Sequence, residues 1–228
     1  MELRLRVVPI ALLAALLSAS VFCMQAAAQT PSSASPQQRP TSEPYTGDLS
    51  IFETPGRDQR LQINRVMDIL GINPGKTIAD IGAGSGWFTV RAAKRVAGNG
   101  LVYAVDINPE ATRYIGERAQ KEHLQNIKTI QSQPDNALLP SDSVDSVLML
   151  KTYHEISHPV TLLRNLRAAL RPGAKVGVID RNGNGENHGL DKDVVIREAK
   201  EAGYSLLNDY DFVKGDKMDY FLVFTAAQ

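Results

Sequence analysis

One short segment, Asp80-Ile81-Gly82-Ala83-Gly84-Ser85-Gly86, constrains the fold of this chain more than any other. The residues at 77–81 are apolar enough for a buried strand, and those at 85–97 carry apolar side chains at helical spacing. Glycine at such a junction lets the backbone turn sharply and lets a ligand touch the main chain. A strand, a glycine turn and a helix therefore predict a parallel α/β sheet with a ligand at the turn.

The spacing of the glycines argues against two common phosphate-binding loops. The dinucleotide fingerprint requires Gly-x-Gly-x-x-Gly, but here the third glycine comes one residue early and Trp87 occupies its position. The mononucleotide phosphate loop requires Gly-Lys-Ser/Thr, which does not follow. The segment predicts a different ligand.

Strand and helix patterns alternate through the rest of the domain. Apolar periodicity predicts strands at 101–107, 127–131, 144–150 and 174–180, and helices at 57–70, 109–123, 159–170 and 191–202. The last two strands, 204–212 and 220–225, have no helix between them and should form an antiparallel hairpin. The pattern predicts a three-layer α/β fold, with a mostly parallel sheet covered by helices on both faces.

Residues 1–28 have the layout of a secretory signal peptide. Arg4 and Arg6 precede an apolar run at 7–24, and small residues up to Ala28 follow, so we expect cleavage near Ala28 and export to the periplasm or beyond. The run is about as long as a short membrane span, which leaves an uncleaved anchor as the alternative.

The single cysteine, Cys23, is preceded by Phe22 rather than by a small residue, so we do not expect lipid attachment. Residues 29–55 are rich in Pro, Ser and Thr and predict a flexible linker without a core of its own. The folded domain is expected at 56–228, which is long enough for one substantial core.

Acidic residues follow the next two predicted strands. Asp106 ends the second strand, where a carboxylate can accept both hydroxyls of a ribose. Asp135, beside Asn136, follows the third strand, where a carboxylate can accept an adenine amino group. Each acid alone is also explained as a solvated loop residue or a helix cap. Together with the glycine turn they predict a nucleoside site.

These features resemble the class I S-adenosylmethionine-dependent methyltransferases. Asp80-x-Gly82-x-Gly84-x-Gly86 matches the family's first motif, Asp106 its ribose-binding acid, and Leu170-Arg171-Pro172-Gly173 the turn before its fifth strand. The resemblance covers 57–225 and implies a Rossmann-like fold with strand order 3-2-1-4-5-7-6. It also implies S-adenosylmethionine as co-substrate. The residues expected to hold it are Asp80, Gly82, Ala83, Gly84, Gly86, Asp106, Ile107, Asp135, Asn136 and Lys151.

Methyl transfer from a sulfonium needs few catalytic groups from the protein. The donor is already activated, so alignment supplies most of the catalysis, and a base is needed only if the acceptor must lose a proton. Tyr153 and His154 follow the fourth strand. They either shape the acceptor pocket, with His154 as a general base, or only form a wall of the donor site. His188, in the polar loop 181–189, either contacts the acceptor or is solvated.

A competing motif lies at His154-Glu155-Ile156-Ser157-His158, which satisfies the His-Glu-x-x-His pattern of zinc hydrolases. That pattern requires both histidines on one face of a helix, and Pro159 disfavours helical geometry at His158. No clear third ligand is evident. We therefore expect no metal, and a zinc hydrolase is a remote alternative.

The expected function is methyl transfer to a small molecule. The chain carries 25 Lys+Arg against 25 Asp+Glu and has no arginine cluster, which argues against a nucleic-acid partner. Cleavage of the signal would leave no stable membrane contact, and the sequence does not define the oligomeric state. Because the donor is made in the cytoplasm, an exported nucleoside-binding protein of the same fold, without turnover, is the main alternative.

Overall fold

The computed structural model describes residues 47–184 and 188–227, together with Glu2, Arg39, Thr41 and Tyr45. The predicted signal peptide, apart from Glu2, and much of the predicted linker lie outside the described residues, so export stays a prediction. Among the residues described, no helix combines the length and the apolar character needed to cross a membrane.

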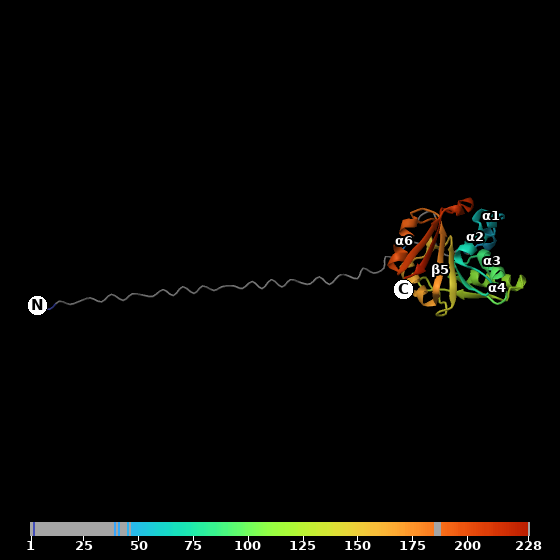
Figure 1. The fold of residues 1–228 in the computed structure, drawn as a ribbon, viewed down its shortest axis with the longest axis horizontal. Coiled ribbons are helices and arrows are strands. Elements are labelled where there is room, and N and C mark those ends of the chain that lie inside the picture. The colour runs from blue at the N-terminus through green and yellow to red at the C-terminus, as the bar shows by residue number, and fades with distance from the viewer. Residues whose placement is uncertain are drawn as a thin grey trace. The chain divides into compact units, whose positions relative to one another are not determined.

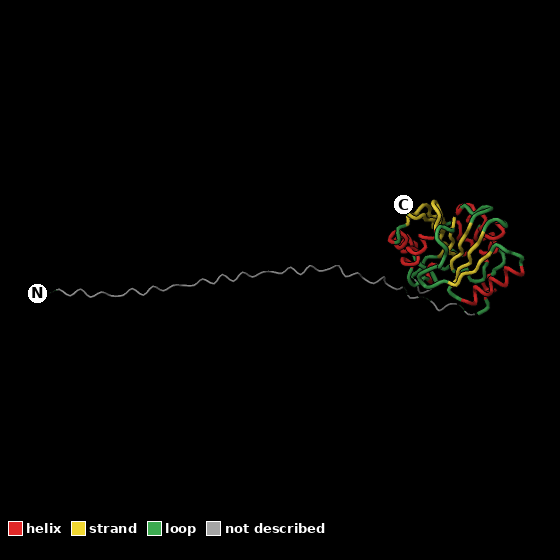
Figure 2. Tube along the Cα trace, turned by 90° about the horizontal axis from the view of Figure 1, so that it is seen from below, coloured by secondary structure: helices red, strands yellow, loops and turns green. Residues whose placement is uncertain are grey.

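Seven strands form one sheet in the order β3-β2-β1-β4-β5-β7-β6. Figure 2 shows strands of this sheet side by side, in yellow. The strands are β1 Thr77–Ile81, β2 Leu101–Asp106, β3 Ile127–Gln131, β4 Val144–Leu150, β5 Leu170–Asp180, β6 Tyr204–Tyr210 and β7 Tyr220–Ala226. Strands β1 to β5 pair in parallel, whereas β7 runs antiparallel to both β5 and β6. The predicted Rossmann-like fold, its strand order and its terminal hairpin are confirmed.

Helices cover both faces of the sheet because alternate strand residues are apolar on both sides. They are α1 Arg57–Leu61, α2 Ile63–Leu70, α3 Trp87–Val96, α4 Pro109–Lys121, α5 Pro159–Leu166 and α6 Lys192–Glu201. Val147 packs in the core beneath α5 and α6, and its neighbour Leu148 packs in the core beneath α2 and α3. Figure 1 shows the same division, with α6 on one side of β5 and α1 to α4 on the other.

Several element boundaries differ from the expected ones. The helix predicted at 57–70 is broken at Gln62, whose φ of 52° lets both Leu61 and Ile63 face the core. Helix α3 begins at Trp87 rather than 85, since Gly86 has a left-handed backbone. Strand β5 begins at Leu170, four residues early, and a register shift in its pairing with β4 accommodates the extra residues.

The C-terminal hairpin also has a different connection. The strand predicted to reach Phe212 ends at Tyr210, and a 3-10 helix at Phe212–Asp216 takes the place of the expected short turn. Val213 in that helix is buried against the core beneath α2 and α3, which explains why the connection is ordered as a helix.

Part of the predicted linker packs on the domain. A 3-10 helix forms at Leu49–Phe52, capped by the Asp48 side chain, and Leu49 is buried. Earlier still, the guanidinium of Arg39 donates to the main-chain oxygen of Tyr153 at 2.8 Å. Contacts with the domain therefore begin well before residue 56.

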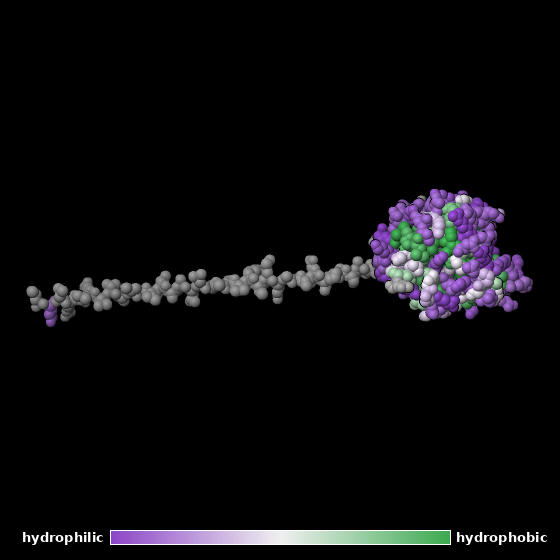
Figure 3. All heavy atoms as spheres, viewed as in Figure 1, coloured by the Kyte–Doolittle hydropathy of each residue, from purple (hydrophilic) through white to green (hydrophobic). Residues whose placement is uncertain are grey.

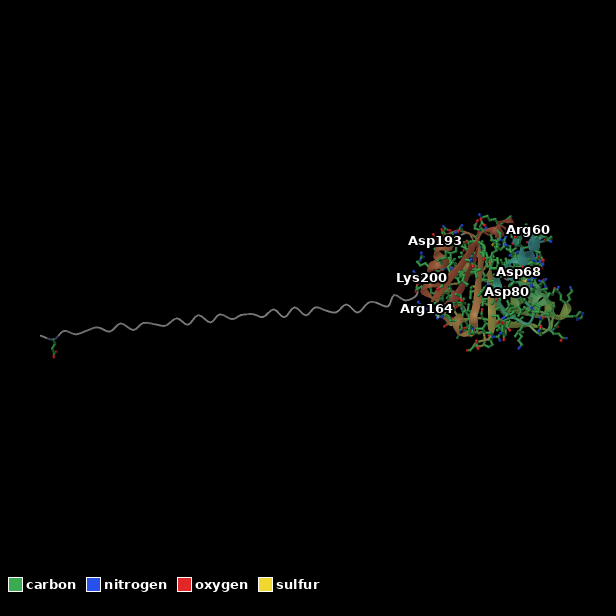
Figure 4. All side chains as sticks on the ribbon, in the orientation of Figure 1. Arg60, Asp68, Asp80, Arg164, Asp193 and Lys200 are labelled. Atoms are coloured by element: carbon green, nitrogen blue, oxygen red, sulfur yellow. The ribbon has the colours of Figure 1, made fainter. Side chains whose placement is uncertain are left out.

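Polar side chains cover most of the domain face seen in Figure 3, where one apolar area is also visible. Figure 4 labels charged residues of the surface helices, such as Asp193 and Lys200, together with Asp80 in β1. Unlike Lys200, Asp80 is buried, at 2% exposure. A buried carboxylate beside the glycine turn is the first feature of the site.

Candidate active site

The candidate site lies at the carboxyl ends of the parallel strands. From β1 the chain order runs outward to β2 and β3 on one side and to β4 and β5 on the other. Ligands of such sheets bind where the order reverses, which here is between β1 and β4. The predicted binding residues follow β1, β2, β3 and β4, so the fold gathers them at this edge.

The glycine turn and the segment after β4 are in contact. Gly82 has a φ of 71°, and a β-carbon at this position would lie 2.2 Å from the Thr152 hydroxyl oxygen. That hydroxyl donates to the main-chain oxygen of Gly82 at 3.3 Å. Only glycine fits at position 82, both for its backbone conformation and for this close approach.

Asp106 joins the glycine turn to the end of β2. Its carboxylate accepts hydrogen bonds from the main-chain N–H of Gly84 at 2.8 Å and of Asn108 at 2.9 Å. Burial raises the pKa of Asp106, and the two amides oppose that effect. Each carboxylate oxygen keeps a further lone pair, which is what a ribose diol requires. The next residue, Ile107, is 41% exposed and gives an apolar surface beside that acid.

Asp80 lies beneath the glycine turn and is not open to solvent. The hydroxyl of Thr89 donates to it at 2.6 Å. Burial raises the pKa of Asp80 to about 7, and the nearby charge of Asp106 adds to the rise. The protonation of the Asp80 carboxyl therefore changes near neutral pH.

The loop after β3 offers one free carboxylate. The side-chain oxygen of Asn136 accepts from the main-chain N–H of Leu138 at 2.9 Å, so this amide is used within its own turn. Asp135 is half-buried, and its carboxylate has no hydrogen bond within the described parts of the chain. Ser132 donates its N–H to the main-chain oxygen of Asp106 at 2.9 Å, which fixes this loop beside β2.

The residues of the segment after β4 differ strongly in their exposure to solvent. Lys151 is exposed, with a φ of 55°, and its N–H donates to the Ile179 oxygen at 2.7 Å. Tyr153 is completely buried, and its hydroxyl donates to Glu198 at 3.0 Å. Burial raises the pKa of Tyr153 well above its usual value, with the charge of Glu198 adding to it. A phenol held in this way lies in the core and is bonded to Glu198, so a catalytic role for Tyr153 stays a prediction that this geometry does not support.

His154 is paired with a residue that the sequence reading missed. Its Nδ1 lies 2.8 and 3.0 Å from the two carboxylate oxygens of Asp180, the last residue of β5. Asp180 is fully buried and His154 is 3% exposed. The pattern that identified Asp106, an acidic residue at the end of a parallel strand, also applies to Asp180 and could have identified it.

The His-Glu-x-x-His pattern does not form a helical metal site. Residues Tyr153–Glu155 form a 3-10 helix, and His158 has non-helical dihedrals as the residue before α5. Instead, Nδ1 of His188 lies 3.1 Å from Oε1 of Glu155, and Nε2 of His154 lies 3.4 Å from the same oxygen. The polar loop after β5 therefore brings His188, rather than His158, to His154.

Comparison with known proteins agrees with this geometry. Residues 78–173 match the family described as a methyltransferase domain. The fold and the site together define a Rossmann-like methyltransferase architecture. One curated relative is a 2-phytyl-1,4-naphtoquinone methyltransferase of Trichormus variabilis, 29% identical over 111 residues, which cover 48% of each chain. The chain spans about half the length of the curated relatives it matches.

Among solved structures, a SAM-dependent methyltransferase from Aquifex aeolicus superposes with a TM-score of 0.70 at 24% identity, covering 77% of this chain and 95% of the other. The [4+2]-cyclase SpnF superposes with a TM-score of 0.62 at 14% identity, covering 74% and 81%. These likenesses show the fold. The cyclase also shows that this fold is not restricted to methyl transfer.

Proposed function

We propose that the protein is an S-adenosylmethionine-dependent methyltransferase that acts on a small molecule. The observation that carries the proposal is the Asp106 carboxylate at the end of β2, which accepts from Gly84 in the glycine turn after β1, next to the point where the strand order reverses. This arrangement suits a nucleoside whose ribose lies on Asp106 and whose adenine lies between Ile107 and Asp135. The match of residues 78–173 to a methyltransferase domain supports it.

Binding of the demethylated donor product tests this proposal. Titration of the full chain with S-adenosylhomocysteine in a calorimeter should give micromolar affinity. Asp106→Ala should weaken that affinity by about 1–3 kcal/mol, because two charge-assisted hydrogen bonds to the ribose are lost. Glu117→Ala, which removes an exposed carboxylate from α4, is the matched control and should bind like the unchanged protein. A folded protein that does not bind would contradict the proposal.

For the acceptor, we propose a hydroxylated aromatic compound or quinol. The naphthoquinone methyltransferase relative supports this class, and the balanced charge of the chain gives no basic excess of the kind that nucleic-acid binders carry. Incubation with a donor carrying an isotopically labelled methyl group and a panel of quinols, followed by mass spectrometry, should find one labelled product. Donor binding without transfer across the panel would favour the alternative of a binding protein without turnover.

We also propose that the chain is exported. The basic residues and the apolar run of 1–28 support this. N-terminal sequencing of the mature protein from the producing cell's export fraction should begin at Gln29. An intact N-terminus in the membrane fraction would instead support an uncleaved anchor.

A further inference from the structure

We propose that His154, Glu155 and His188 form a binding site for a divalent transition-metal ion of the zinc type. They bring two imidazole nitrogens and one carboxylate oxygen within 4.8 Å of one another. The proposal concerns metal binding and holds whether or not the methyl-transfer proposal does. It differs from the expectation that the chain binds no metal, and it makes His154 a ligand in place of the two alternatives of a base or a wall of the donor site.

The first argument is the protonation pattern of His154. Its Nδ1 faces both oxygens of Asp180, at 2.8 and 3.0 Å, so Nδ1 must carry a hydrogen. In a neutral imidazole, Nε2 then presents a lone pair, and it lies 3.4 Å from the carboxylate oxygen of Glu155. Two acceptors that face each other repel, so a proton or a cation must lie between them. A histidine that donates its other N–H to a carboxylate is the usual arrangement for a metal ligand.

The second argument is that a residue from a separate segment of the chain reaches the same Glu155 oxygen. His188 belongs to the loop after β5, yet its Nδ1 lies 3.1 Å from the same Glu155 oxygen. Two ligands about 2.1 Å from a tetrahedral zinc ion lie about 3.4 Å apart. The separations of 3.1 and 3.4 Å match that geometry. A proton on Nε2 of His154 would account for only one of these two approaches, whereas one cation bound to the Glu155 oxygen would account for both.

The third argument is that the site is built to hold its ligands in place. Asp180 fixes the buried His154 ring. Arg181 donates from Nε to the main-chain oxygen of His188 at 2.9 Å, and the Leu190 N–H donates to the Arg181 oxygen at 2.8 Å. These two hydrogen bonds hold the backbone of the loop, while the His188 side chain is 62% exposed. Two histidines and one glutamate leave the fourth position open, which is typical of catalytic rather than structural zinc sites.

Zinc binding to the full chain, without an affinity tag, tests the proposal. After chelator treatment, calorimetric titration with Zn²⁺ should show one ion per chain, and Co²⁺ substitution should give the visible absorption of a low-coordinate nitrogen and oxygen site. His188→Ala should weaken binding about 10-fold or more, without unfolding the protein, because this side chain is exposed. Asp180→Asn should weaken it about 10–100-fold through the orientation of His154.

The matched controls are the two other histidines of the chain. His123→Ala removes a histidine that follows the C-terminal end of α4. His158→Ala removes the second histidine of the His-Glu-x-x-His pattern. Both should bind Zn²⁺ like the unchanged protein. Absence of stoichiometric binding by folded protein, equal affinity in His188→Ala, or loss of binding in His158→Ala would each overturn the site. Titration of the same samples with S-adenosylhomocysteine separates this outcome from failure of the methyltransferase proposal.

Discussion

Arg39 and Glu198 lie 159 residues apart in the chain, yet the Arg39 guanidinium reaches both Glu198 carboxylate oxygens at 2.6 Å. The same guanidinium donates to the main-chain oxygen of Tyr153, and Glu198 accepts from the Tyr153 hydroxyl. These bonds hold Arg39 against the 3-10 helix Tyr153–Glu155, which carries His154.

Arg39→Met should destabilise the protein by about 2–3 kcal/mol, because Glu198 would stay largely buried without its cationic partner. Urea unfolding measures this change, and hydrogen exchange should quicken in the amides of 153–157. Arg164→Met is the control, since the Arg164–Glu201 pair is exposed and should contribute less than about 1 kcal/mol. Equal effects of the two substitutions would show that Arg39 does not anchor this segment.

Gly82→Ala should lower the free energy of unfolding by at least about 2 kcal/mol and impair donor binding. The added methyl group would overlap Thr152 and would sit on a left-handed backbone. Gly116→Ala is the opposite case, because a β-carbon there meets nothing within 4 Å inside α4. It should stabilise the protein by about 0.5–1 kcal/mol. Thermal and urea unfolding of both variants compare the two sites.

Asp180→Ala should cost about 2–4 kcal/mol, because it leaves buried donors without an acceptor. These are the ring of His154 and its main-chain N–H, which lies 3.3 Å from the carboxylate. Asp180→Asn keeps the shape of the side chain and should cost less. Chemical unfolding of the two variants separates loss of packing from loss of charge. A cost for Asp180→Ala below that for Asp180→Asn would contradict the role given to the hydrogen bonds.

Asp80 should make stability depend on pH. Its pKa is about 7 in the folded protein, against 3.8 for an ordinary aspartate, so the folded chain retains a proton that the unfolded chain has released. The free energy of unfolding should therefore fall as pH rises from about 4 to 7, and the total loss should be a few kcal/mol. Asp80→Asn, which cannot ionise, should flatten that part of the profile. Urea midpoints across this pH range measure it, and an unchanged slope in the variant would assign the dependence to other groups.

Much of the fold follows from local sequence. Apolar periodicity located each strand, and the glycine turn with Asp106 located the expected donor site. The ends of helices and strands differ from the expected ones where tertiary contacts outweigh local preference. Gln62 interrupts a continuous helical pattern because Leu61 and Ile63, the residues on either side of it, are both buried in the core. The 3-10 helix at Leu49–Phe52 forms in a polar stretch because Leu49 finds a buried place on the domain.

The sequence by itself determined the α/β architecture and the strand ends at which polar groups collect, because periodicity and glycine geometry are properties of neighbouring residues. Only the tertiary structure decided which of those groups meet. His158 is close to His154 in sequence but has non-helical dihedrals where the chain enters α5 and does not join the cluster of His154, Glu155 and His188. His188, 34 positions away from His154, lies beside it, with the two ring centroids 5.9 Å apart. Asp180 faces His154 because β4 and β5 are neighbours in the sheet. Such pairings depend on contacts between segments far apart in the chain, which the pattern of neighbouring residues does not encode.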